Sequence, residues 1–248
     1  FIFVGDPQIG SSNSAKDDSP EDMQTPEFLT AQSEAVRNDS FNWNYTLNRA
    51  FAKTGNSANF ILSAGDQIQT NYEDAEDTRI SEIEYAGYLS PDVMKSVPVA
   101  TTVGNHDADN PNYTYHFNIA NMSDLGDNGY VGGDYYFTYG DPLFMILNTQ
   151  DTNVSEHKQF IEETVAANQD CKWRIVTLHQ DIYGSAEHSN EPEITNLRYS
   201  LVPIFEENDV DIVLTGHDHA YSRTKMLQGG QSTTGFEYTD DAFDEQLA

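Results

Sequence analysis

Apolar and polar positions divide this chain into two kinds of segment. Short runs of aliphatic, aromatic and β-branched residues are typical of buried strands. They occur at Phe1–Val4, Asn59–Ser63, Val97–Thr102, Tyr135–Tyr139, Leu143–Asn148, Arg174–Leu178 and Asp211–Leu214. Longer segments with helical periodicity lie between them, at Phe28–Lys53, Arg79–Leu89, Glu156–Asn168 and Glu193–Glu207. Strands that alternate with helices in this way predict an α/β fold, in which helices cover the sheets.

Two regions depart from this alternation. Tyr135–Tyr139 and Leu143–Asn148 flank the sequence Gly-Asp-Pro at 140–142, which predicts a hairpin. An antiparallel pair in an otherwise alternating pattern predicts a mixed sheet, or two sheets packed together. Ser11–Pro26 is rich in Ser, Asp and Pro and has almost no apolar content, so we expect a long surface loop there.

The pattern favours one main domain over residues 1–228. Residues 229–248 contain a Gly-Gly pair, several Thr and a run of acids, and we interpret them as a carboxyl-terminal tail or linker. Because the chain opens inside a predicted core strand at Phe1, we expect flanking segments or domains outside it. The longest uninterrupted apolar stretch, Leu143–Leu147, is far too short for a transmembrane segment.

Charge excludes some classes of partner. The chain has 12 Lys and Arg against 41 Asp and Glu, a formal net charge of −29. This balance argues against a protein that sheathes nucleic acid or binds an anionic membrane surface, because both need clustered Lys and Arg. With its Tyr- and Asn-rich loops, the acidity favours a secreted or cell-surface protein, with the cytoplasm as the alternative. The single cysteine, Cys171, cannot form an internal disulfide, and we expect a packed thiol.

Oxygen and imidazole donors follow directly after five of the predicted strands, most of them next to a glycine. In chain order they are Asp6 and Gln8, Asp66, Asn105 and His106, His179, and His217 and His219. Ligands of open α/β sheets bind beyond the carboxyl ends of the strands, so we expect these side chains to converge. A lone Asp there is more often a cap or turn former, but the coincidence of five motifs argues for a site. We interpret the other histidines, His116, His157 and His188, as structural.

The donor types indicate metal ions. Imidazole, carboxylate and amide donors together suit Fe, Mn or Zn, and there are more donors than one tetrahedral ion needs. We therefore expect two divalent or trivalent transition-metal ions that share a bridging carboxylate. Two divalent ions bring four positive charges, and Asp6, Asp66 and a bridging hydroxide would cancel three. The surplus of about one positive charge would attract a phosphoryl group.

The ordered motifs resemble the calcineurin-like metallophosphoesterases. They are Asp6-x-Gln8, Gly65-Asp66, Gly104-Asn105-His106-Asp107, His179 and Gly216-His217-Asp218-His219. The resemblance extends from Phe1 to about Arg223, and Gly216–Arg223 looks most like the purple acid phosphatase branch. It implies a fold of two mixed β-sheets packed as a sandwich, with helices on the outside in four layers. Residues 1–228 would then be a metallophosphoesterase catalytic domain.

The resemblance also implies a role for each position. The first ion would be held by Asp6, Gln8, Asp66 and His219, and the second by Asp66, Asn105, His179 and His217. His106 matches the family's histidine that binds no metal, contacts the phosphate and can protonate the leaving oxygen. The implied function is hydrolysis of a phosphate mono- or diester by a metal-bound hydroxide, with His106, Asp66 and Asn105 as the catalytic residues.

Two departures leave alternatives open. Most of the family has His where this chain has Gln8, a weaker donor, so the first metal site would be looser or its ion would keep an extra water. Purple acid phosphatases place a Tyr three residues after the bridging Asp, where this chain has Gln69, so their colour and ferric preference are not expected. One alternative is a surface-displayed binding module that kept the fold with weak or no turnover. Another is a metal-dependent hydrolase of a substrate other than phosphate, which the charge arithmetic disfavours.

Three neighbouring features receive lesser predictions. Asp107 and Asp218 stand beside predicted ligands and would either orient the imidazoles or form turns. The polar segment Glu187–Glu193 follows the strand end at His179, and we expect it to overhang the site and influence the choice of substrate.

Overall fold

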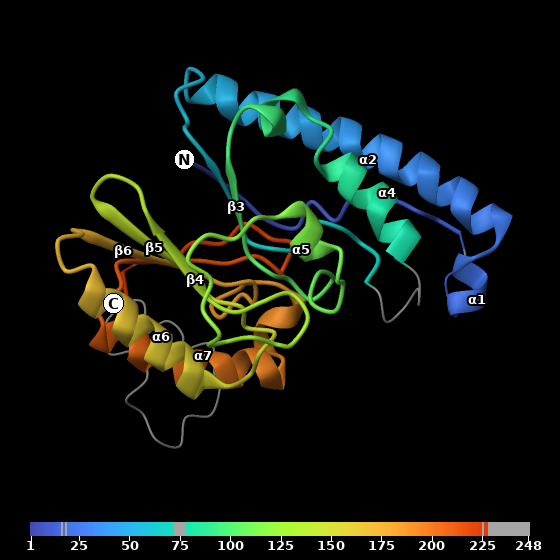
Figure 1. Cartoon of the computed structure of the whole chain (residues 1–248). Coiled ribbons are helices and arrows are strands. Elements are labelled where there is room, and N and C mark those ends of the chain that lie inside the picture. The colour runs from blue at the N-terminus through green and yellow to red at the C-terminus, as the bar shows by residue number, and fades with distance from the viewer. Residues whose placement is uncertain (16, 18, 72–77, 225, 228–248) are drawn as a thin grey trace.

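The computed structural model describes residues 1–248 except 16, 18, 72–77, 225 and 228–248 (Figure 1). The strands are β1 (Ile2–Val4), β2 (Ile61–Ser63), β3 (Val99–Thr101), β4 (Tyr135–Thr138), β5 (Pro142–Ile146), β6 (Trp173–Thr177) and β7 (Ile212–Leu214). The α-helices are α1 (Pro20–Met23), α2 (Pro26–Lys53), α4 (Thr78–Tyr88), α5 (Tyr113–His116), α6 (Val154–Ala167) and α7 (Pro192–Glu207). Two 3₁₀ helices are η1 (Asp92–Lys95) and η2 (Glu187–Asn190). The predicted tail 229–248 and its boundary lie outside the described residues.

The strands form two sheets. The first has the order β1-β2-β3, and all of its pairs are parallel. The second has the order β4-β5-β6-β7, in which β4 and β5 are antiparallel and the other pairs are parallel. The predicted hairpin is therefore confirmed, and it makes the second sheet mixed. The first sheet was also expected to be mixed, but its described strands are all parallel because no hairpin joins them.

The sheets pack face to face, and the side-chain alternation along each strand separates the layers. Leu62 of β2 and Phe144 and Ile146 of β5 lie in the apolar cluster between the sheets. Their neighbours point the other way. Ile61 lies in the cluster with α2 and α4, whereas Leu143 belongs to the cluster with α6 and α7. Figure 1 shows the two helix pairs on opposite sides of the sheets. The predicted sandwich with outer helices is confirmed.

The expectation of a long loop over Ser11–Pro26 was wrong in part, because a short helix lies within it. The side chain of Ser19 accepts a hydrogen bond from the backbone N–H of Asp22 (3.2 Å), which caps α1 at Pro20. Met23, at the end of α1, is buried against Phe28 and Ile80. A cap followed by proline specifies a helix start even in a polar segment, whereas amino-acid composition alone does not predict one.

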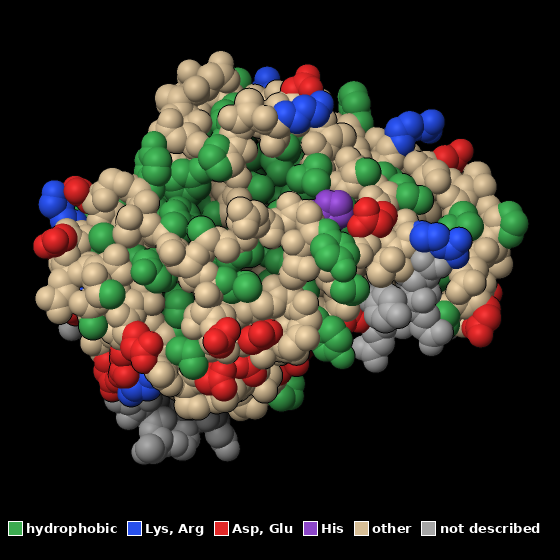
Figure 2. All heavy atoms as spheres, viewed as in Figure 1, with side chains coloured by type: hydrophobic (Ala, Val, Ile, Leu, Met, Phe, Trp, Pro, Cys, Tyr) green, Lys and Arg blue, Asp and Glu red, His purple; other side chains and the backbone are tan. Residues whose placement is uncertain are grey.

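Some surface expectations can be compared with the structure. On the face shown in Figure 2, acidic side chains gather over the region of α6 and α7, while Lys and Arg are few and scattered. Cys171 is partly buried and packs against the apolar cluster of the second sheet, as expected of a packed thiol. Among the described residues, no helix combines the length and the apolar character needed to cross a bilayer.

A buried ion pair confirms the structural interpretation of His157. Its Nδ1 donates to Asp134 Oδ2 (2.8 Å) and its Nε2 donates to the Asp151 carbonyl (2.9 Å). Burial by itself lowers the pKa of His157, but the hydrogen bond and charge of Asp134 outweigh burial and raise it. Both side chains of the pair have no exposed area. The pair joins α6 to the segments that precede β4 and follow β5.

We expect His157→Gln to lower the free energy of unfolding by about 3–5 kcal/mol, because it leaves the buried Asp134 carboxylate without its cationic partner. The measurement is urea denaturation at neutral pH. The control is His116→Gln, since His116 pairs with the exposed Glu82 (3.0 Å) and such pairs contribute less than about 1 kcal/mol. Equal stability losses for the two variants would contradict a special role for the buried pair.

Candidate metal centre

The predicted donors converge at one edge of the sandwich, where five loops follow β1, β2, β3, β6 and β7. Backbone hydrogen bonds tie these loops together. Gln8 N donates to Asp66 O (3.0 Å), and Gly216 N donates to His179 O (2.9 Å). Because parallel strands end at the same edge of a sheet, residues far apart in sequence become neighbours there.

The loops approach so closely that two glycine positions have no room for a side chain. A Cβ on Gly104 would collide with Asp66 Oδ1, and a Cβ on Gly216 would lie 2.5 Å from Asp6 Oδ2. These contacts explain why glycine precedes the donors after β3 and β7.

Five of the predicted ligands have a left-handed backbone. The φ angles are +51° for Asp6, +34° for Gln8, +50° for Asp66, +69° for His217 and +50° for His219. Non-glycine residues rarely adopt this conformation, and it costs about 1–3 kcal/mol at each position. Such strain concentrates where a fold must aim particular side chains, which is consistent with a functional site.

The first group of potential ligand atoms comes from Asp66, His179 and His217. His179 is fully buried, and its Nδ1 donates to the Ala64 carbonyl (2.8 Å), which leaves Nε2 facing the group. From His179 Nε2, Asn105 Oδ1 is 3.0 Å away, His217 Nδ1 is 3.2 Å away and Asp66 Oδ2 is 3.3 Å away. All four residues that the resemblance assigns to the second ion therefore lie together.

The second group comes from Asp6, Asp66 and His219. His219 Nε2 lies 3.7 Å from Asp6 Oδ1, and both Asp6 oxygens accept the backbone N–H of His217 (2.9 and 3.0 Å). Asp66 belongs to both groups, as a bridging carboxylate must. For Gln8 the structure establishes a backbone bond to Asp66, and its role as a ligand stays a prediction.

The electrostatics of the first group suit a cation. Burial by itself lowers the pKa of His179, but the charges of Asp66 and Asp6 and the bond to Asp66 outweigh burial and raise it to about 9. Burial and then the neighbouring His179 and His188 lower the pKa of His217 to about 4. The carboxylates thus favour positive charge among these donors. Its carboxylate, imidazole and amide donors fit a first-row transition metal.

His106 stands beside this centre and outside both groups. Its backbone N–H donates to Asp66 Oδ1 (2.9 Å), while its ring Nε2 lies 4.0 Å from Asp66 Oδ2. On the other side of the ring, Nδ1 lies 2.5 Å from the carbonyl oxygen of Gln69. A carbonyl can only accept, so Nδ1 carries a proton and Nε2 is the nitrogen that faces the centre.

Asp107 and Asp218 accept hydrogen bonds from backbone N–H groups. The alternative prediction, that they orient the imidazoles, was therefore wrong. The buried Asp107 accepts the backbone N–H groups of Asp66 (2.8 Å) and Gly104 (3.0 Å). Asp218 accepts those of Ser185 (2.9 Å) and His188 (3.0 Å). Each carboxylate therefore fixes the course of a loop next to the site.

His188 and Glu191 were missed as neighbours of the centre. His188 Nδ1 lies 2.7 Å from Glu191 Oε1, and the rings of His188 and His217 are 4.7 Å apart. Together the three residues form a third group of potential ligand atoms. This placement confirms that the segment Glu187–Glu193 reaches the site. His188 does not directly follow a strand, as the predicted ligands do, so its position in the sequence does not mark it.

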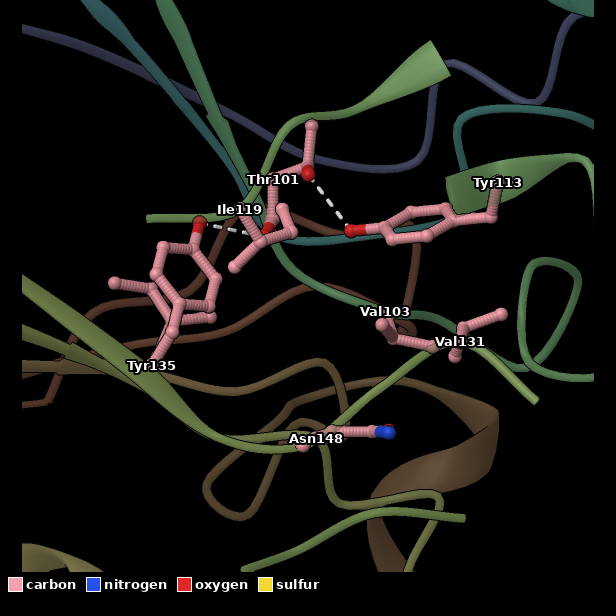
Figure 3. A pocket seen from close by; sticks show the side chains of 9 residues that line it. Thr101, Val103, Tyr113, Ile119, Val131, Tyr135 and Asn148 are labelled. Atoms are coloured by element: carbon pink, nitrogen blue, oxygen red, sulfur yellow. Dashed lines mark hydrogen bonds between the residues drawn. The ribbon is translucent and has the colours of Figure 1, made fainter. Parts of the chain in front are cut away.

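A small cavity lies away from the predicted ligands, between the two sheets (Figure 3). Near it, the Tyr113 hydroxyl hydrogen-bonds to the Thr101 hydroxyl (2.7 Å), and the Tyr135 hydroxyl donates to the Thr101 carbonyl (2.8 Å). Val103 and Val131 also line it. These contacts belong to the packing of the sandwich, and the cavity contains none of the predicted ligands.

Comparison with known proteins agrees with this geometry. A family model described as calcineurin-like phosphoesterase matches residues 1–221. Purple acid phosphatase 4 of Arabidopsis thaliana is 26% identical over 198 residues, which are 68% of this chain and 55% of that protein. An uncharacterised protein of Mycobacterium tuberculosis is 25% identical over 157 residues, 55% of this chain and 30% of that protein. The chain thus spans about half or less of these relatives.

Among solved structures, a dimetal phosphatase from Danio rerio superposes with a TM-score of 0.51. The superposition covers 88% of this chain and 80% of that one, with 15% sequence identity. At this level of identity the likeness supports the fold.

Proposed function

Since this chain belongs to the calcineurin-like phosphoesterase family, we propose that it hydrolyses a phosphate mono- or diester at the edge where the five loops meet. One observation carries the proposal. Asp66 is shared by two groups of ligand atoms, from Asp6 and His219 on one side and from His179 and His217 on the other. A shared carboxylate between two donor groups is what a pair of metal ions requires.

The proposed ligands divide between two transition-metal ions, either divalent or trivalent, with Fe, Mn and Zn as candidates. Asp6, Gln8, Asp66 and His219 would hold the first ion, and Asp66, Asn105, His179 and His217 the second. Such a pair supplies a water of lowered pKa and neutralises the charge on phosphoryl oxygens.

His106 is the proposed general acid. With its Nδ1–H held by the Gln69 carbonyl (2.5 Å), a protonated ring presents its other N–H, at Nε2, to the centre. That proton can pass to the oxygen of the leaving group when the ester bond breaks. The backbone N–H of His106 is tied to Asp66 Oδ1 (2.9 Å), which keeps the acid at a constant place beside the proposed bridge.

The centre is open to solvent on one side. The His219 side chain is 53% exposed, whereas Asp66 is 2% exposed. A phosphoryl group could therefore reach the donors from outside while the proposed bridging carboxylate stays protected.

Elemental analysis together with a substrate panel tests the proposal. We expect two transition-metal ions per chain and metal-dependent turnover of p-nitrophenyl phosphate or bis(p-nitrophenyl) phosphate. Removal of the metal with a chelator should abolish turnover, and adding it back should restore it. A preparation with two ions that is inert towards both esters would contradict the proposal and support the binding-module alternative.

A further inference from the structure

A buried carboxylate outside the metal centre is connected to the proposed acid. Glu84 lies on α4 with no exposed area, and Figure 1 shows α4 alongside α2. Its two oxygens accept hydrogen bonds from Thr70 N (2.9 Å), Thr70 Oγ1 (2.7 Å), Gln69 N (3.2 Å) and Gln32 Nε2 (2.5 Å). All four donors are neutral, and burial raises the pKa of Glu84 to about 7 against their opposing effect.

Such a group is costly to keep in an apolar interior, because none of these donors neutralises its charge. A neutral amide of the same shape could not replace it. The carboxylate accepts all four bonds, whereas Gln would turn an NH₂ group towards some of the same donors. A carboxylate is therefore suited to hold a segment through several of that segment's N–H and O–H groups at once.

The segment that Glu84 holds carries the acceptor for His106. Gln69 shares its N–H between Glu84 and the Ile9 carbonyl (3.2 Å each), and its own carbonyl receives the ring N–H of His106 (2.5 Å). Thr70, the next residue, is bound to Glu84 by both backbone and side chain. Two hydrogen bonds, one at each end of Gln69, thus connect the carboxylate to the imidazole.

We propose that Glu84 is a positioning residue which fixes residues 69–70, so that the Gln69 carbonyl orients the His106 imidazole with Nε2 towards the leaving group. This inference rests on the proposed function. Without the carboxylate, the Gln69 carbonyl would move, and the ring of His106 would lose its fixed tautomer and direction. None of the proposed metal ligands donates one of these hydrogen bonds to Glu84, so both ions should remain bound when Glu84 is replaced.

The test compares esters with poor and good leaving groups in Glu84→Gln. We expect kcat/KM for phenyl phosphate to fall by about tenfold or more, because its leaving group needs a proton. For p-nitrophenyl phosphate, whose leaving group needs little assistance, the fall should be less than about threefold. Metal content should stay unchanged. Glu82→Gln, an exposed position on the same helix, should leave both rates as they are.

Two further variants keep the test decisive. If Glu84→Gln folds poorly, Thr70→Val removes only the hydroxyl donor (2.7 Å) and should shift the ratio of the two rates in the same direction, by less. In a His106→Ala background, Glu84→Gln should have no further effect on that ratio. Equal losses for both esters, or an additional shift without His106, would overturn the inference. Inactivity of the unmodified, metal-loaded protein would instead contradict the proposed function.

Discussion

Asp66→Asn is expected to lower kcat/KM for a phosphate ester by about 10³-fold, because it removes the negative charge that both proposed ions would share. Elemental analysis should show fewer than two ions per chain. The backbone should tolerate the change, since Asn adopts the left-handed conformation of Asp66 (φ +50°) more readily than most residues. The remaining amide oxygen can also still accept the His106 N–H.

The matched control is Asp209→Asn. Asp209 has a similar left-handed backbone (φ +49°), and its side chain is 90% exposed. It precedes β7, whereas the proposed ligand His217 follows that strand. The same chemical change there should alter neither turnover nor metal content. Full activity and two bound ions in Asp66→Asn would refute the bridging assignment.

His106→Ala is expected to lower kcat/KM for phenyl phosphate by about 10²–10⁴-fold, the usual contribution of a positioned general acid. The loss for p-nitrophenyl phosphate should be smaller, and both ions should remain bound because the His106 ring lies outside the ligand groups. The backbone bond from His106 to Asp66 does not need the side chain. Steady-state kinetics with both esters, together with elemental analysis, checks these expectations.

His116→Ala serves as the control, since its ring pairs with Glu82 and belongs to none of the groups of potential ligand atoms. It should leave both rates unchanged. If His106→Ala hydrolyses phenyl phosphate at the full rate, His106 is not the acid, and the ordering of residues 69–70 by Glu84 would then have no catalytic consequence.

The order of strands and helices was predictable because their periodicities are local. The apolar run at Asn59–Ser63 marked the strand that forms β2, and the hairpin at 140–142 was marked by its turn residues. Convergence of the donors also followed from a simple rule, since parallel strands deliver the residues after them to one edge. The residue pattern therefore determined the α/β class and the approximate membership of the candidate site. The sandwich was an implication of the family resemblance, because the pattern itself left a single mixed sheet open.

The partners of individual side chains depended on contacts between elements far apart in the chain. Nothing near Glu84 in the sequence shows that its carboxylate binds residues 69–70, and nothing near Asp107 shows that it accepts the N–H of Asp66. His188 likewise reached His217 only through the packing of the segment that Asp218 holds. A periodic pattern specifies which face of an element is buried. Hydrogen bonds between distant segments are decided by how the buried faces pack together, and only the tertiary structure contains that information.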